Sequence, residues 1–287
     1  MLTGLTKETT MPYCTVAQEN NENIELYYED YGTGDPVILI HGWPLSHKMW
    51  EAQVPVLIDA GYRVISYDRR GFGQSTQTWD GYNYDTFAED LAKLIEHTGA
   101  DNATLVGFSM GGGEVARYIG KFGTGKLKKA VLMSSVTPFL LKTSDNPEAA
   151  DQSVFDGMLG GLTKNRPEFL KGFIKNFYNF DGGQSGLTEA NLAYDWAIAV
   201  MASPKGSIDC VKAFSGTDFR EDLKKFDIPT LILHGDDDNI VPLAISGQKA
   251  HELLPTSELV VLEGAPHGIT VSHPDAVNGA LLNFLQS

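Results

Sequence analysis

Short apolar runs alternate with amphipathic segments along most of this chain. Runs that predict strands lie at residues 24–28, 36–40, 62–67, 103–106, 127–134, 229–234 and 258–262. Between them, residues 86–97 place apolar side chains on one helical stripe, and residues 275–285 predict a closing helix. This alternation predicts an α/β fold with a doubly wound, mostly parallel sheet. Ligands of such sheets bind beyond the carboxyl ends of the strands.

The pattern changes between residues 136 and 214. Strand-like runs are absent from this segment, which reads as helical and is rich in Phe, Tyr, Trp and Met. We therefore predict a core of residues 1–135 and 215–287, with residues 136–214 inserted as a helical cap. Any one aromatic side chain more often packs a cap onto its core than touches a ligand. Together they predict an apolar pocket, with candidate lining residues Val136, Phe139, Leu140, Phe173, Ile240 and Leu243.

Composition narrows the range of partners. The formal net charge of −15 disfavours binding to nucleic acid or to anionic membranes. No apolar stretch has the length of a membrane span. Residues 1–11 resemble a loose leader without the pattern of a signal peptide, and Cys14 and Cys210 match no metal-site spacing. We expect two reduced thiols in a cytoplasmic protein. The oligomeric state stays open, with a homo-oligomer as one option.

A glycine-rich turn separates the strand at residues 103–106 from a helical segment at residues 114–119. It reads Gly107-x-Ser109-x-Gly111, the nucleophile-elbow pattern in which a serine lies on a sharp strand-to-helix turn. The alternative is a tight structural turn in which the serine has no catalytic role. A phosphate loop is excluded because no Lys-Ser/Thr follows the last glycine, and no dinucleotide-binding G-x-G-x-x-G is present here. The flanking strand and helix favour a serine nucleophile.

A serine nucleophile needs a base that is held by a third group. His267 follows the last predicted strand, and the cluster Asp236–Asp238 follows the strand at residues 229–234. The resulting order Ser…Asp…His is that of the α/β-hydrolases. The residues alone leave open which aspartate of the cluster is the acid. A calcium loop is disfavoured, because residues 240–242 are Ile-Val-Pro where further oxygen ligands are needed, so no metal is expected.

The other histidines have structural interpretations. His41 and His234 each close a strand before a glycine, which predicts hydrogen-bonded structural groups. We expect His47, His97, His251 and His273 to face solvent.

An acyl-transfer site also needs donors for the developing oxyanion. The N–H of Met110 follows the nucleophile directly and is the first candidate. The second donor should come from the loop after the strand at residues 36–40. Pro44 has no N–H, which favours Trp43.

Several motifs together resemble one known family. They are His41-Gly-Trp-Pro44, Tyr67-Asp-Arg-Arg-Gly-Phe-Gly-Gln-Ser75, Tyr82-x-Tyr-Asp-Thr-Phe87, Val106-Gly-Phe-Ser-Met-Gly111 and Ala265-Pro-His-Gly268. The set resembles the cofactor-free (non-haem) haloperoxidases and bacterial arylesterases of the α/β-hydrolase fold. The resemblance runs from about residue 12 to the C-terminus, cap included.

The resemblance implies a role for each candidate residue. Ser109 would be the nucleophile, His267 the base and Asp238 the acid, with Trp43 and Met110 as the oxyanion donors. The implied chemistry is acyl transfer through a serine ester, with no cofactor. Water would release a carboxylic acid, whereas hydrogen peroxide would release a peracid that oxidises halide away from the enzyme.

The leading hypothesis is therefore a hydrolase of small aryl or alkyl esters with perhydrolase activity. A lactonase or an amidase of the same mechanism remains an alternative, as does a ligand receptor that keeps the pocket without turnover. Haloalkane dehalogenases and epoxide hydrolases resemble a class with Asp at the elbow, so Ser109 disfavours both. Because Pro44 restricts the preceding residue, we also expect the Trp43 carbonyl to help hold peroxide.

Overall fold

The computed structural model describes residues 12–182 and 186–287. The predicted leader at residues 1–11 lies outside them. In the described part, one sheet contains the strands in the order β1-β2-β4-β3-β5-β6-β7-β8. Their bounds are β1 Tyr13–Glu19, β2 Glu22–Tyr31, β3 Pro36–Ile40, β4 Arg63–Tyr67, β5 Ala103–Phe108, β6 Leu127–Met133, β7 Thr230–Gly235 and β8 Glu258–Leu262.

The sheet is antiparallel at one end and parallel elsewhere. β1 pairs with β2 and β2 with β4 in antiparallel fashion, whereas every pair from β4 through β3 to β8 is parallel. All residues of β5 and β7 are buried, which is why these strands read as continuous apolar runs. The predicted doubly wound, mostly parallel α/β sheet is confirmed.

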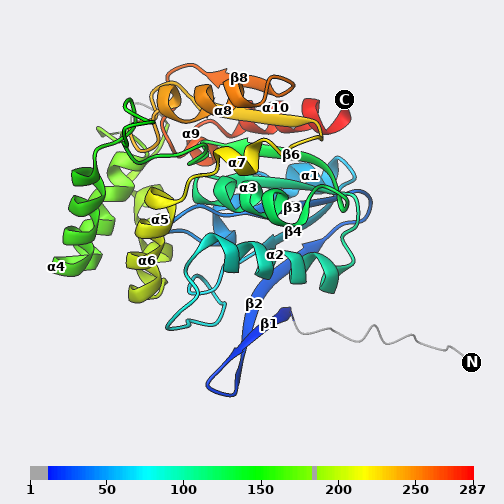
Figure 1. The fold of residues 1–287 in the computed structure, drawn as a ribbon, viewed down its shortest axis with the longest axis horizontal. Helices are drawn as coiled ribbons and strands as arrows, with labels where there is room; N and C mark the ends of the chain where they lie inside the picture. The colour runs from blue at the N-terminus through cyan, green and yellow to red at the C-terminus, as the bar shows by residue number, and fades with distance from the viewer. Residues whose placement is uncertain (1–11, 183–185) are drawn as a thin grey trace, which may run out of the picture.

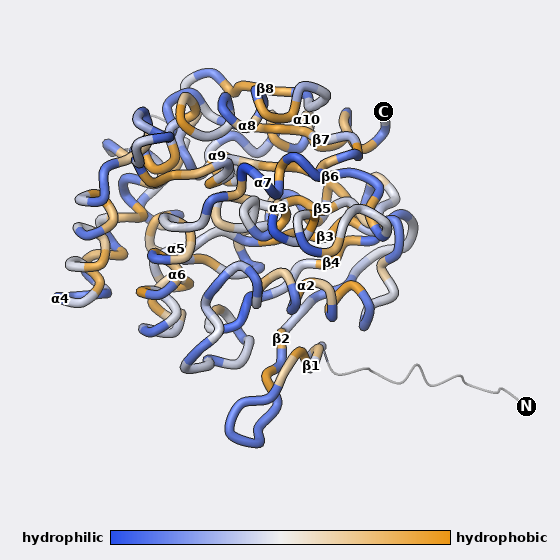
Figure 2. Tube along the Cα trace, viewed as in Figure 1, coloured by the Kyte–Doolittle hydropathy of each residue, from blue (hydrophilic) through white to orange (hydrophobic). Residues whose placement is uncertain are grey.

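Helices connect the parallel strands and cover the sheet (Figure 1). α2 and α3 pack on each other and α3 also packs on β5, while α1 packs on β4 and α10 on β7. Apolar segments gather in the strands and polar ones on the outer turns (Figure 2). The bounds of these helices are α1 Val54–Asp59, α2 Tyr84–Thr98, α3 Met110–Phe122, α8 Gly247–Leu253, α9 Ile269–Ser272 and α10 Pro274–Gln286. Two short 3₁₀ turns are η1 His47–Trp50 and η2 Leu243–Ile245.

The segment between β6 and β7 supplies a second group of helices, the first three of which lie to the left in Figure 1, while the last lies nearer its centre. They are α4 Gln152–Phe177, α5 Glu189–Met201, α6 Pro204–Gly216 and the short α7 Arg220–Leu223. α4 packs against both α5 and α6. It is bent at Asn165, whose backbone is not helical, two residues before Pro167. None of the described helices is both long and apolar enough to cross a membrane.

Candidate active site

Ser109 occupies a strained turn between β5 and α3. Its φ is 53° and its ψ is −117°, a conformation that costs a non-glycine residue about 1–3 kcal/mol. The flanking glycines permit the turn, because a Cβ at Gly107 would lie 2.4 Å from the Gly111 oxygen. A Cβ at Gly111 would lie 2.4 Å from the Ile40 oxygen. The local sequence therefore fixes the serine above the sheet, at the first turn of α3.

The structure brings Ser109, His267 and Asp238 together from the ends of three strands. His267 Nε2 lies 2.9 Å from Ser109 Oγ, and His267 Nδ1 lies 2.6 Å from Asp238 Oδ2. Since a carboxylate only accepts, His267 Nδ1 donates to Asp238, and Nε2 is left to accept from the serine hydroxyl. All three side chains are buried. This is the geometry of a nucleophile, a base and an orienting acid.

Asp238 is held in its ionised form. Burial opposes its charge, but the neighbouring His267 and His234 rings outweigh burial and lower the pKa of Asp238 well below its ordinary value. Its Oδ1 also accepts hydrogen bonds from the Ile240 and Val241 amides, at 2.9 and 2.7 Å. A permanent carboxylate keeps a proton on the facing nitrogen of His267.

The other two aspartates of the cluster point elsewhere. Asp236 Oδ1 accepts from the Gly264 amide at 2.6 Å, and Asp237 Oδ2 accepts from Asn179 Nδ2 at 2.9 Å. Both residues are exposed. The geometry therefore identifies Asp238 as the aspartate of the cluster that contacts His267, a choice that the sequence alone left open.

Aromatic rings enclose the His267 imidazole. The Phe108 and Phe177 rings lie 5.0 and 4.9 Å from it, centroid to centroid. Tyr178 packs closely on Gly268, the residue after His267, since a Cβ at Gly268 would lie 2.2 Å from the Tyr178 ring. The Tyr178 hydroxyl donates to Asp195 of α5, and burial raises the pKa of Asp195 to about 6. The His267 loop is thus fixed against α4 and, through Tyr178, against α5.

The two candidate oxyanion donors lie on facing segments. Met110 begins α3, and Trp43 lies in the loop after β3. That loop passes beside Ser109, since a Cβ at Gly42 would lie 3.0 Å from Ser109 Cβ. Within residues 12–182 and 186–287, neither the Trp43 amide nor the Met110 amide has a hydrogen-bond acceptor. Both N–H groups are therefore available for a negatively charged oxygen beside Ser109.

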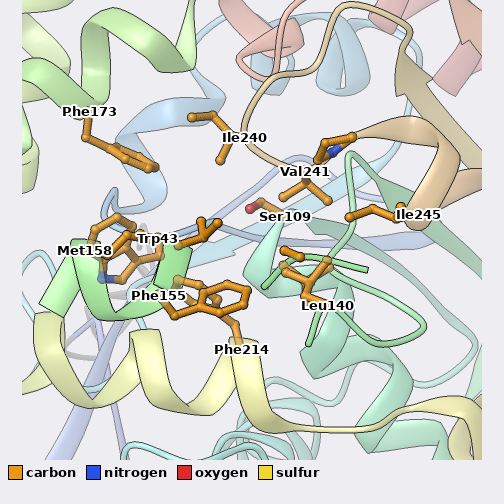
Figure 3. A pocket seen from close by; sticks show the side chains of 14 residues that line it. Trp43, Ser109, Leu140, Phe155, Met158, Phe173, Phe214, Ile240, Val241 and Ile245 are labelled. Carbon is orange, nitrogen blue, oxygen red and sulfur yellow. The ribbon is translucent and has the colours of Figure 1, made fainter. Parts of the chain in front are cut away.

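An apolar cavity opens over Ser109 (Figure 3). The cavity and its mouth together enclose about 540 Å³. Figure 3 shows the Ser109 oxygen pointing into the space among the lining side chains. Those side chains belong to Trp43, Val136, Leu140, Ala150, Val154, Phe155, Met158, Phe173, Phe214, Ile240, Val241, Pro242 and Ile245. The lining favours an uncharged, apolar substrate group.

Of the six pocket candidates, Val136, Leu140, Phe173 and Ile240 line this cavity. Phe139 and Leu243 do not. The Phe139 ring packs under the Arg220 guanidinium, 5.5 Å away, and Leu243 packs near Gly247 at the start of α8. The 3₁₀ turn η2 brings Ile245 to the cavity instead.

Phe155 and Met158 belong to the apolar side chains of residues 136–214 that together predict a pocket, but they were not among the six candidates, and neither was Phe214. The three-residue spacing of Phe155 and Met158 on α4 was the available signal, but it fits a packed core equally well.

Two histidines expected to be structural have the predicted hydrogen bonds. His41 Nε2 accepts from the Arg69 amide at 3.0 Å, and burial lowers the pKa of His41 to about 3. His234 Nε2 lies 2.8 Å from the Val241 oxygen. The expectation for His47 was wrong, because its ring is buried with Nδ1 2.7 Å from Asp68 Oδ1. Among the described residues, no group of three or more His, Cys, Asp or Glu side chains is arranged to hold a metal ion.

Comparisons with known proteins agree with the fold and the motifs. The model of the alpha/beta hydrolase fold family matches residues 35–274. A putative non-heme chloroperoxidase of Synechocystis sp. is 52% identical, over 96% of this chain and 100% of its own. A bifunctional esterase/perhydrolase of Acinetobacter calcoaceticus is 41% identical, over 93% of this chain and 98% of its own.

The structural similarity extends over almost the whole molecule. The crystal structure of a bromoperoxidase from Bacillus anthracis matches with a TM-score of 0.92 and 50% identity, over 96% of this chain and 99% of the other. The chain therefore belongs to the α/β-hydrolase family, among the non-haem haloperoxidases.

Proposed function

We propose that this protein is a serine hydrolase that cleaves small carboxylic esters through an acyl-enzyme and that also carries out perhydrolysis. One observation carries the proposal: Ser109 Oγ, His267 Nε2 and Asp238 form a continuous hydrogen-bonded chain at the base of an apolar cavity. The names of the relatives, which include a chloroperoxidase and an esterase/perhydrolase, support the same chemistry.

In the first half-reaction, Ser109 Oγ attacks the ester carbonyl while His267 Nε2 takes the hydroxyl proton. The carbonyl oxygen becomes an oxyanion, which the Trp43 and Met110 amides would stabilise. His267 then gives its proton to the departing alcohol, and the acyl group remains on Ser109. Asp238 holds the imidazolium in place throughout.

In the second half-reaction, His267 activates the molecule that attacks the acyl-enzyme. Water gives a carboxylic acid, and hydrogen peroxide gives a peracid; in both cases the proton returns to Ser109 through His267. The cavity, the nucleophile and the oxyanion donors serve both reactions. A single site therefore accounts for the esterase and the haloperoxidase names among the relatives.

We further propose that α4, α5 and α6 act as the cap predicted for residues 136–214. Phe155, Met158 and Phe173 of α4 and Phe214 of α6 form walls of the cavity over Ser109. Because these walls carry no charge, we expect esters with small uncharged acyl groups to bind better than those with free carboxylates.

Hydrolysis of p-nitrophenyl acetate tests the proposal. We expect continuous turnover that stops after treatment with an organophosphonate that modifies serine. Ser109→Ala should lower kcat by about 10⁴-fold or more, with residual activity from the oxyanion donors. Added peroxide should yield peracetic acid, detected by bromide oxidation. A single slow turnover would instead indicate a receptor, and greater activity on lactones or amides would change the substrate class.

We also propose a cytoplasmic location. Cys14 and Cys210 are both unpaired and buried, and free thiols persist in a reducing compartment. Cell fractionation tests this location.

A further inference from the structure

An ion pair lies buried in the core behind the nucleophile. Glu114, on the second turn of α3, is fully buried, and its Oε2 accepts from Arg69 Nε at 2.7 Å. Arg69 follows β4 and is 1% exposed. The Tyr67 hydroxyl donates to the other oxygen of Glu114. The proposed mechanism uses none of these three groups.

The same arginine reaches the loop that carries Trp43. Arg69 Nη2 donates to the His41 oxygen at 3.0 Å, and the Arg69 amide donates to His41 Nε2 at 3.0 Å. Since His41 Nε2 accepts, the ring carries its proton on Nδ1, which donates to the Gly42 oxygen at 2.9 Å. His41 and Gly42 are thus held by directed hydrogen bonds immediately before Trp43.

These contacts connect the two segments that bear the oxyanion donors. Glu114 belongs to α3, whose first residue is Met110, and Arg69 links Glu114 to the main chain two residues before Trp43. Two amides stabilise one oxyanion only if their separation matches the developing oxygen. A rigid link between the two segments would fix that separation.

We propose that Arg69 and Glu114 are positioning residues that hold the Trp43 amide in register with the Met110 amide. The inference rests on the proposed esterase function and assigns a role to residues that touch no substrate. Removing the pair would loosen the main chain that carries the Trp43 amide. The Trp43 side chain would stay in the cavity wall, because its Nε1 donates to the Ser207 oxygen at 3.1 Å and its ring packs on Phe173. The chemical step should then slow, while substrate binding stays nearly the same.

A purely structural role is the competing explanation. Replacing a buried ion pair with apolar residues of similar size is often neutral or stabilising, so the pair is not needed for stability alone. Arg69 Nη1 is moreover buried without a hydrogen-bond partner in the described structure. The directed hydrogen bonds from Arg69 to His41 point instead to a positioning role.

The test replaces the network by apolar groups in the triple variant Tyr67→Phe, Arg69→Met, Glu114→Leu. We expect a folded protein with kcat on p-nitrophenyl acetate lowered by about 10- to 100-fold and KM changed by less than about threefold. The rate at which an organophosphonate modifies Ser109 should fall together with kcat.

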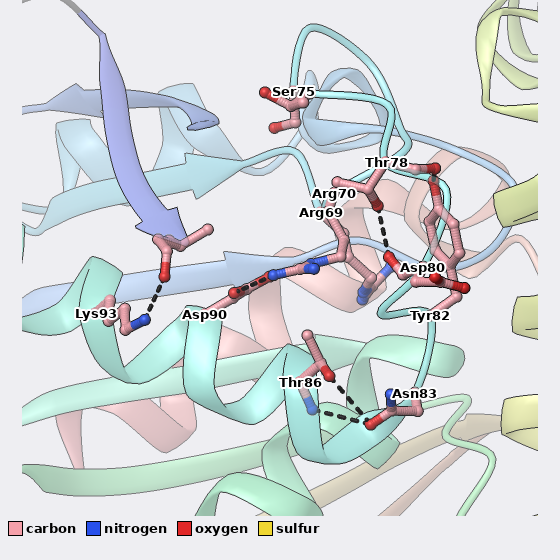
Figure 4. A network of polar contacts seen from close by, with 12 residues as sticks. Arg69, Arg70, Ser75, Thr78, Asp80, Tyr82, Asn83, Thr86, Asp90 and Lys93 are labelled. Carbon is pink, nitrogen blue, oxygen red and sulfur yellow. Dashed lines mark hydrogen bonds and ion pairs between the residues drawn. The ribbon is translucent and has the colours of Figure 1, made fainter. Parts of the chain in front are cut away.

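The neighbouring pair Arg70 and Asp90 provides a matched control (Figure 4). Arg70 Nε and Nη2 donate to Asp90 at 2.7 and 2.8 Å, and both side chains are buried. This pair joins the β4 loop to α2 without contacting the His41 loop. The double variant Arg70→Met, Asp90→Leu should therefore keep kcat within about twofold of the parent.

Arg69→Lys decides the question if the triple variant does not fold. A lysine keeps the charge, but its single ammonium cannot reproduce the planar arrangement in which Nε meets Glu114 while Nη2 meets His41. A lower kcat with unchanged KM supports the positioning role. A folded triple variant or Arg69→Lys variant with the parental kcat would overturn it. Absence of esterase activity in the unmodified protein would instead refute the proposed function.

Discussion

Asp238→Asn gives a sharp test of the proposed triad. The asparagine keeps one carbonyl oxygen, which can still accept from the Ile240 and Val241 amides, so the loop should retain its shape. Its amide nitrogen then faces His267 Nδ1, where the carboxylate oxygen lay at 2.6 Å. Because that nitrogen donates, His267 must accept at Nδ1 and carry its proton on Nε2. The ring can no longer take the proton of Ser109.

The expected loss is large and falls on the chemical step. The corresponding exchange in Ser-His-Asp proteases lowers kcat by about 10⁴-fold, which is about 5.5 kcal/mol of transition-state stabilisation. Asp238 is not among the residues that line the cavity, so KM should change little. In the variant, the Ile240 and Val241 amides donate to a neutral amide oxygen instead of a carboxylate. We expect this change to lower the free energy of unfolding by about 1–2 kcal/mol.

Steady-state hydrolysis of p-nitrophenyl acetate at neutral pH measures the effect, with Asp236→Asn and Asp237→Asn as matched controls. Both control residues are exposed and bond the Gly264 amide and Asn179 rather than His267. We expect the controls to stay within a few-fold of the parent. If Asp238→Asn retained more than about a tenth of kcat while a control lost its activity, the assignment of the acid would be wrong.

Three further changes probe other parts of the molecule. Pro44→Leu should lower the ratio of peracid to acid, because Pro44 restricts Trp43 and so directs its carbonyl; an unchanged ratio would remove the role assigned to that carbonyl. Met158→Ala enlarges the cavity, so kcat/KM for hexanoyl relative to acetyl esters should rise by about tenfold; equal effects on both esters would place the acyl group elsewhere. Burial raises the pKa of Asp195 from 3.8 to about 6, so its contribution to stability is complete below pH 3.8 and is lost as the pH rises through about 6. This decline amounts to about 3 kcal/mol in the free energy of unfolding, and Asp195→Asn should abolish it. Urea unfolding at several pH values measures the effect, and an unchanged decline in the variant would mean that other groups cause it.

The sequence is most informative where burial is uniform. The run at residues 36–40 matches β3 residue for residue, because a covered parallel strand needs continuous apolar positions. The run at residues 258–262 also matches β8, although the residues of this edge strand are half-buried or exposed. β1 was not predicted. Only Cys14 and Val16 of its Tyr13–Glu19 segment are buried, and the strand is identified by its pairing with β2 rather than by its own composition.

Contacts between distant residues account for most of the remaining differences. His47 was expected to face solvent, but Asp68, which follows β4, binds its ring and its amide. Phe139 is apolar and close in sequence to Leu140, yet only Leu140 lines the cavity. Local pattern identifies an apolar segment, but which of its members faces a ligand depends on how separate elements dock.

The three residues of the proposed triad follow separate strands, which has a consequence for folding. Ser109 follows β5, Asp238 follows β7 and His267 follows β8, the strand at the far edge of the sheet. Pairing across such long sequence separations is slow compared with forming helices. Ester turnover during renaturation should consequently appear only after the far edge has joined the sheet, later than helical circular dichroism. The appearance of enzymatic activity would therefore report when the last strand has paired and folding is complete.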